Sequence, residues 1–141
     1  MREIIEGIIK EEKGYNCAEL IIRAFDEKFK LNISEQTLKS VKGFGGGMGV
    51  GSTCGIITGA ITGITVMCDG EIYITNKELE ELIKILYNQI KKELKDDSCT
   101  KLLETNKKDG KSCWQMIIDS GEVFEKFIFN NFEVKKINEQ L

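Results

Sequence analysis

The chain has 141 residues, 41% of them hydrophobic, which suffices for one core, so we expect residues 1–141 to form a single domain. The net charge of −3, with lysines and arginines spread along the chain, excludes the concentrated basic face that nucleic acid binding needs. The absence of histidine excludes Ser-His-Asp and Cys-His relays and imidazole metal ligands. Charged and apolar residues alternate in the first stretch of the chain, MREIIEGIIKEEKGYN. This is not the pattern of a secretory leader, so we expect a cytoplasmic protein.

Three apolar stripes with helical spacing predict three helices. The stripes are Ile4, Ile5, Ile8 and Ile9; Ile21, Ile22, Phe25 and Phe29; and Leu79, Leu82, Ile83, Leu86 and Ile90. The third follows a cap residue at Asn76 and has early acids and late lysines, as the helix dipole favours. Only GEIYIT at 70–75 alternates like a strand, and a single strand would have no partner. The pattern predicts an all-α fold, a compact multi-helix bundle with a central glycine-rich loop leading into a buried helix.

The uncharged stretch at residues 44–68 is long enough to cross a bilayer. Eight of its residues are glycine and five are serine or threonine, which makes it too weakly apolar for insertion. Its first third has the composition of a loop. We therefore expect no membrane span and place this stretch in the core of a soluble protein.

Four of the five cysteines come directly after a residue type that favours the N-cap of a helix. Free backbone N–H groups and the positive end of the dipole stabilise a thiolate there, so this position predicts a lowered thiol pKa. The fifth, Cys68, ends the apolar run just before Asp69 and Gly70, where a helix would stop, and is expected to fill the core. The four pairs of cap residue and cysteine are Asn16 and Cys17, Thr53 and Cys54, Ser98 and Cys99, and Ser112 and Cys113.

Thiolates act as nucleophiles, redox centres and metal ligands. The chain has no CxxC motif, so the zinc-ribbon, thioredoxin and ferredoxin signatures are absent and the fold would have to assemble any shared site. Converging helix N-termini would offset the charge of about −2 on four thiolates around one zinc ion or a [4Fe–4S] cluster, and two dithiol/disulfide pairs would use the same geometry. We predict catalytic and metal-ligating roles for Cys17, Cys54, Cys99 and Cys113, with an iron-sulfur cluster or zinc as the candidate cofactor.

Glycines crowd residues 43–51, where they allow positive φ values and successive N–H groups that face one way, as anion-binding nests do. Gly55, Gly59 and Gly63 then recur every fourth residue and form a smooth helical strip, which fits close helix packing as well as a cofactor. No complete GxGxxG pattern occurs, so a dinucleotide fingerprint is excluded. The predicted cofactor-binding glycines are Gly45, Gly46, Gly47, Gly49, Gly51, Gly55 and Gly59.

The order of these motifs resembles the C_GCAxxG_C_C family, which is described as redox-active. The likeness lies in YNCAELIIRAF, GFGGGMGVGSTCGIITGAI, SCTKLL and SCWQMIIDSGEVFEKF, and it covers nearly the whole chain. The four cysteines match those from which the family is named, which implies a redox or cluster-binding role for them. Ile56 stands where the CGAxxG motif has alanine, and its larger side chain would narrow a pocket beside Cys54.

Three functions remain open at this point. The first is electron transfer or thiol redox chemistry at the four cysteines, with a redox partner protein. The second is a binding module that holds a small anion or an anionic cofactor at the glycine-rich loop, with structural cysteines. The third is an interaction protein that docks another helix on the glycine strip. Trp114 is expected to anchor the core, and the stripe formed by Phe124, Phe127, Ile128 and Phe132 fits core packing or a homodimer.

Overall fold

The computed structural model describes residues 1–71 and 74–133, and that part of the chain is helical apart from turns and one isolated antiparallel bridge. The prediction of an all-α fold is confirmed. Shorter helical turns lie at Val41–Phe44, Gly47–Gly51 and Phe129–Glu133. The α-helices are α1 (Arg2–Lys10), α2 (Cys17–Phe29), α3 (Glu35–Ser40), α4 (Gly55–Glu71), α5 (Asn76–Leu94), α6 (Cys99–Lys108) and α7 (Cys113–Ile128).

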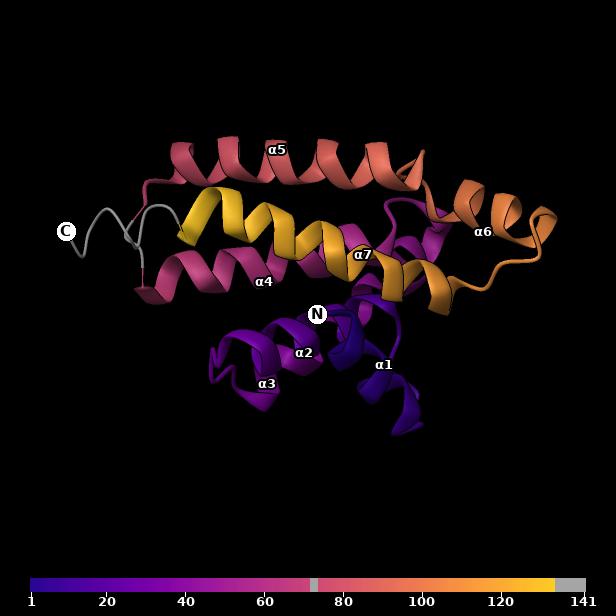
Figure 1. The fold of residues 1–141 in the computed structure, drawn as a ribbon, viewed down its shortest axis with the longest axis horizontal. Coiled ribbons are helices and arrows are strands. Elements are labelled where there is room, and N and C mark those ends of the chain that lie inside the picture. The colour runs from indigo at the N-terminus through magenta and orange to yellow at the C-terminus, as the bar shows by residue number, and fades with distance from the viewer. Residues whose placement is uncertain (72–73, 134–141) are drawn as a thin grey trace.

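The three long helices α4, α5 and α7 lie side by side, and α1, α2 and α3 are grouped on one side of them (Figure 1). α2 packs along α4, α1 packs on both α2 and α7, and α5 packs on α4 and α7. α6 lies at the end of the bundle where α7 begins (Figure 1). The starts of several helices are therefore gathered at one end of the molecule.

Local sequence signals explain most of the helix boundaries. α5 begins with a capping box in which Thr75 Oγ1 accepts from the Glu78 N–H at 3.2 Å, so the cap is Thr75 and not Asn76. The strand-like GEIYIT is not a strand where it is described, because Gly70 and Glu71 belong to α4. Residues 72–73 of this stretch lie outside the described residues.

The core is built where the predicted stripes meet. Phe25 of α2 and Phe124 of α7 are fully buried, with ring centroids 5.4 Å apart. The stripe that contains Phe124 is buried along its length, so it packs inside the protein. Its other members are Phe127, Ile128 and Phe132. Cys68 is buried in the same cluster, as predicted, and so is Ile56. Trp114 is not a core anchor, because 46% of its surface is exposed.

The glycine strip of α4 is the surface on which α2 packs. A Cβ on Gly59 would lie 2.9 Å from the backbone oxygen of Ala18, and one on Gly63 would lie 2.6 Å from Cγ of Phe25. Gly55 is equally close to α2, since its added Cβ would lie 2.9 Å from the Cβ of Cys17. The strip therefore allows close packing within the chain and brings the start of α4 against the start of α2.

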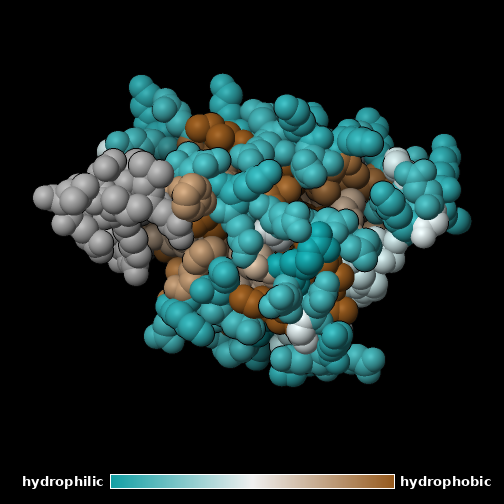
Figure 2. All heavy atoms as spheres, viewed as in Figure 1, coloured by the Kyte–Doolittle hydropathy of each residue, from teal (hydrophilic) through white to brown (hydrophobic). Residues whose placement is uncertain are grey.

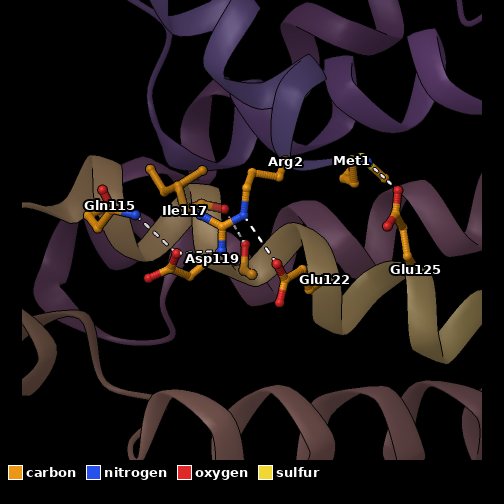
Figure 3. A network of polar contacts seen from close by, with 8 residues as sticks. Met1, Arg2, Gln115, Ile117, Asp119, Glu122 and Glu125 are labelled. Atoms are coloured by element: carbon orange, nitrogen blue, oxygen red, sulfur yellow. Dashed lines mark hydrogen bonds and ion pairs between the residues drawn. The ribbon is translucent and has the colours of Figure 1, made fainter.

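The surface of the molecule is mostly hydrophilic on the face shown in Figure 2, and hydrophobic residues show in the seams between helices. None of the described helices combines the length and apolarity that a bilayer crossing requires. The first residues of α1 are tied to α7 by ion pairs, with Arg2 contacting Asp119 at 2.8 Å and Glu122 at 3.2 Å (Figure 3). The amine of Met1 also contacts Glu125. These contacts hold α1 across α7.

Candidate functional site

Four cysteines lie at the starts of four helices. Cys17, Cys99 and Cys113 are the first residues of α2, α6 and α7, as the cap pattern predicts. Cys54 differs by one residue, because α4 begins at Gly55 and Cys54 therefore takes the cap position itself. Cys54 is buried, whereas the other three thiols are half-buried.

Side-chain caps hold three of these helix starts. The side-chain oxygens of Ser98 and Ser112 accept from the backbone N–H groups of Lys101 and Gln115, at 3.4 and 3.3 Å. Asn16 forms a full capping box, since its side chain accepts from the Glu19 N–H and the Glu19 carboxylate accepts from the Asn16 N–H. The first turns that carry the thiols are therefore fixed by local hydrogen bonds.

We expect Asn16→Ala to lower the free energy of unfolding by about 1 kcal/mol, because the variant loses the cap acceptor at the start of α2. It also loses the hydrogen bond that Asn16 Nδ2 donates to the backbone oxygen of Lys42 at 2.8 Å. Asn16→Asp keeps an oxygen acceptor and should retain most of the stability. Urea denaturation of both variants measures the difference, and equal losses would show that the cap contributes nothing.

The sulfur of Cys54 acts as the cap of α4. The backbone N–H groups of Ile56 and Ile57 in the first turn favour the ionised form of its thiol, and the Ile57 N–H also donates to the Cys54 backbone oxygen at 3.0 Å. Thr53, the expected cap, instead pairs with Ser98 in the antiparallel bridge. The cap pattern predicts the helix start one residue early because it takes Cys54 as a helix residue and not as the cap.

The bridge clamps the segments that lead into α4 and α6. The Cys54 N–H donates to the backbone oxygen of Asp97 at 2.8 Å, and the Cys99 N–H donates to that of Ser52 at 2.6 Å. Each cysteine comes one residue after a bridge residue. The bridge therefore holds Cys54 and Cys99, at the starts of α4 and α6, next to each other in space.

The glycine-rich loop wraps around these helix starts. Added Cβ atoms at Gly45, Gly47 and Gly51 would fall within 2.5 Å of the Asn16 side chain, the Ser52 backbone and the Thr100 hydroxyl respectively. These three glycines are thus needed for close approach to the starts of α2 and α6.

Left-handed backbone gives the loop its shape. Residues 46–49 all have positive φ, including Met48 at 60°, and glycine adopts this conformation without strain. Added Cβ atoms at Gly46 and Gly49 would meet open space, so these two serve the backbone conformation alone. Gly55 and Gly59 face α2. A cofactor contact for any of the seven glycines stays a prediction.

The fold brings the four sequence-distant thiols within electrostatic range of one another. Ionisation of Cys17 is opposed by Cys54, Cys113 and Cys99, in that order. Ionisation of Cys54 is opposed by Cys99 and Cys113, and that of Cys99 by Cys113. Every pair among the four therefore interacts, as expected for one cluster at the end of the bundle.

The pKa values of three thiols are shifted upward, contrary to the expected effect of the helix starts. Burial raises the pKa of Cys17 to about 12 and that of Cys54 to about 11, and repulsion by the neighbouring thiols adds to both. Burial and repulsion by Cys113 also raise the pKa of Cys99. Backbone N–H groups do favour the thiolates of Cys17 and Cys54, as predicted, but desolvation is the larger effect. The cluster is therefore protonated at neutral pH at these three positions.

The fit of the cluster to a metal ion can be tested from the donor positions. Among the described residues, no group of three or more cysteine, aspartate or glutamate side chains is placed to hold one ion. The four thiols supply the right donor chemistry for zinc or an iron-sulfur cluster. Binding of a single tetrahedral ion would require them to move closer together.

A second polar network supports the Cys54 side of the cluster. The Tyr87 hydroxyl donates to Asp97 Oδ2 at 2.7 Å and also hydrogen-bonds the Thr53 side chain. Lys91 Nζ lies 3.5 Å from the same carboxylate oxygen, and both partners help to hold the pKa of Asp97 below its usual value. Since the Asp97 backbone oxygen accepts from the Cys54 N–H, this network anchors the loop that positions the thiol. No local sequence pattern links residues 53, 87 and 97, so this network could not be predicted from the sequence.

We expect Tyr87→Phe to lower the free energy of unfolding by about 2 kcal/mol, because it leaves a charged acceptor without its hydrogen bond. Tyr15→Phe is the matched control. This variant removes a hydroxyl but keeps the aromatic ring, whose centroid lies 4.2 Å from the guanidinium carbon of Arg23. Denaturant titrations of the two variants make the comparison, and an equal effect would argue against a special role for the Tyr87 hydroxyl.

Comparison with protein-family models matches residues 15–127 to the family described as "Putative redox-active protein (C_GCAxxG_C_C)". No curated protein and no solved structure gives a significant match. The matched stretch contains the four clustered cysteines and the glycine-rich loop, so the resemblance seen in the motifs is confirmed over most of the chain. The chain belongs to the C_GCAxxG_C_C family.

Proposed function

We propose that the protein is an electron-transfer protein whose reaction centre is the cluster of Cys17, Cys54, Cys99 and Cys113, which is oxidised in pairs to disulfides. The observation that carries this proposal is the closeness of all four thiols, which come from four separate helix starts and lie near enough for each to oppose ionisation of the others. A fold that needed cysteine only as a small apolar residue would have no reason to gather them. Cys68, buried apart from the helix starts, has no part in the proposal.

The order of the electrostatic effects on Cys17 favours Cys17 with Cys54 as the inner pair and leaves Cys99 with Cys113 as the outer pair. Cys54 opposes ionisation of Cys17 more than either other thiol does, and the missing side chain of Gly55 lets Cys17 approach the start of α4. The remaining two thiols are half-buried and oppose each other. The outer pair would exchange electrons with a partner, and the inner pair would be less accessible because Cys54 is buried.

Each oxidation step converts two thiols into one disulfide. Two S–H bonds break, one S–S bond forms, two protons are released and two electrons pass to an acceptor, which can be a disulfide that is itself reduced to two thiols. Burial keeps Cys17, Cys54 and Cys99 protonated and slow to react unassisted, so a docked partner that accepts the proton would control the rate. Oxidation also removes the repulsion that the cluster would suffer on ionisation.

A bound iron-sulfur cluster or zinc ion is the second candidate, and the four-sulfur donor set supports it. Backbone N–H groups at the starts of α2 and α4 would help to offset the negative charge of the thiolates. A bound iron-sulfur cluster would supply one-electron redox chemistry, and the four cysteines would hold it. A structural zinc ion would supply none.

Anaerobic purification followed by metal analysis and thiol counting separates these candidates. The disulfide proposal predicts a metal-free protein that loses two or four thiols reversibly in glutathione redox buffers. Cys68→Ala should keep that reversible loss, and Cys113→Ser should lose the outer pair. Stoichiometric iron and sulfide, or zinc, would favour the second candidate. Metal-free protein whose thiol count does not change on oxidation would overturn both.

A further inference from the structure

A pocket of about 320 Å³ opens between the end of α1 and the start of α7. Ile8 and Ile9 of α1 and Leu20 of α2 form its apolar walls, and Tyr15 and Trp114 supply two aromatic rings. Tyr15 is two residues before Cys17, and Trp114 is the residue after Cys113. The pocket therefore adjoins two of the four helix starts that carry the thiols.

The chemistry of the lining limits what the pocket can bind. Its size is that of a small-molecule site, and its walls are apolar and aromatic. Lys13 and Glu12 at the rim carry one charge of each sign, so an anionic ligand gains little there. Indole and phenol rings are electron-rich and stack on flat, electron-poor rings. Arg23, held over the Tyr15 ring, fixes that ring in place.

We infer that this pocket binds a small, neutral, electron-accepting ring of the quinone class, which takes electrons from the outer cysteine pair. The inference rests on the proposed thiol redox function and names its acceptor. Trp114 stacks on the ring, and the Lys13 ammonium donates a hydrogen bond to a ring oxygen. Trp114 is the one tryptophan of the chain, and 46% of its surface is exposed. A stacking role for its ring explains this exposure.

The reaction balances without any further reagent. Cys99 and Cys113 lose two protons and two electrons and form one disulfide. The quinone gains the same two protons and two electrons, its two carbonyl groups become hydroxyl groups, and the hydroquinone leaves. Reduction of the disulfide by a dithiol then returns the protein to its starting state.

Duroquinone is the probe, because methyl groups on its ring block addition of a thiol to the ring. Trp114 is the sole tryptophan, so its fluorescence reports binding directly. We expect saturable quenching, both in the reduced protein and in a variant with all four clustered cysteines replaced by serine. The matched control is Trp114→Phe combined with Phe129→Trp, which moves the fluorophore to another exposed aromatic position at the far end of α7. It should show only linear, collisional quenching.

Oxidation rates supply the second arm. With duroquinone, Trp114→Ala should be oxidised at least tenfold more slowly than the unaltered protein, whereas with hydroxyethyl disulfide the two should react at similar rates. Lys13→Ala, at an exposed position, should slow the quinone reaction alone. Linear quenching of Trp114, or quinone rates unaffected by Trp114→Ala, would overturn the inference.

The two arms keep this inference separate from the proposed function. Saturable quenching in a protein whose thiols resist every oxidant would leave the pocket standing and refute thiol redox chemistry. Reversible oxidation by the disulfide without saturable quenching would do the reverse.

Discussion

Gly59→Ala is expected to lower the free energy of unfolding by about 2 kcal/mol, although alanine favours helix more than glycine does. The added methyl group would lie 2.9 Å from the backbone oxygen of Ala18 and 3.0 Å from the Cβ of Ile21. Neither atom is the end of a flexible side chain, so α2 and α4 would have to move apart. The same movement would shift Cys17 relative to Cys54, because α2 begins at Cys17.

Gly7→Ala in α1 is the matched control, with the opposite sign expected. Gly7 is exposed in the middle of a helix, and an added Cβ would meet nothing within 4 Å. Alanine there should raise the free energy of unfolding by about 0.5 to 1 kcal/mol. Urea denaturation of the two variants gives both values. A stabilising Gly59→Ala would show that the glycine strip is not a packing surface.

The second large effect is alkaline destabilisation caused by the buried thiols. Their ordinary pKa is 9.0, and the folded protein raises it to about 12 for Cys17 and about 11 for Cys54. Below about pH 8 both thiols are protonated in the folded and the unfolded chain, so they have almost no effect on stability. As the pH rises further, the unfolded chain loses these protons first and is favoured. At pH 10.5 this amounts to about 2 kcal/mol for each thiol.

The double variant Cys17→Ala, Cys54→Ala isolates this effect, because it shares every lysine and tyrosine titration with the unaltered protein. Denaturant titrations at pH 8 and pH 10.5, with reductant present, should show a steeper decline in the unaltered protein. The loss should level off once the pH exceeds the folded pKa values. An equal decline in both proteins would mean that the thiols are more solvated than the structure has them.

The sequence predicted the parts of this site that local signals determine. Cap residues such as Asn16 and Ser112 specify helix starts by hydrogen bonds to residues three positions on, so Cys17 and Cys113 could be placed in first turns without coordinates. The helical spacing of apolar residues likewise predicts which faces of α1, α2 and α5 are buried. Each of these features depends on residues close together in the chain.

Features that depend on tertiary packing could not be predicted in the same way. Helix starts alone predict lowered thiol pKa values, but α2 packed on α4 buries Cys17 and Cys54 and reverses the direction. Trp114 is a large aromatic residue in an apolar segment, which is typical of a core position. Its side chain is nevertheless exposed at the start of α7, beside α1. The glycine strip fitted two functions until the position of α2 showed what covers it.

The most direct test of the cluster is disulfide mapping by mass spectrometry of the folded protein, oxidised at low concentration after full reduction. The account predicts intramolecular disulfides that join Cys17, Cys54, Cys99 and Cys113 only among themselves, with Cys68 recovered as a thiol. Disulfides that include Cys68, or that form only between molecules or after unfolding, would contradict it.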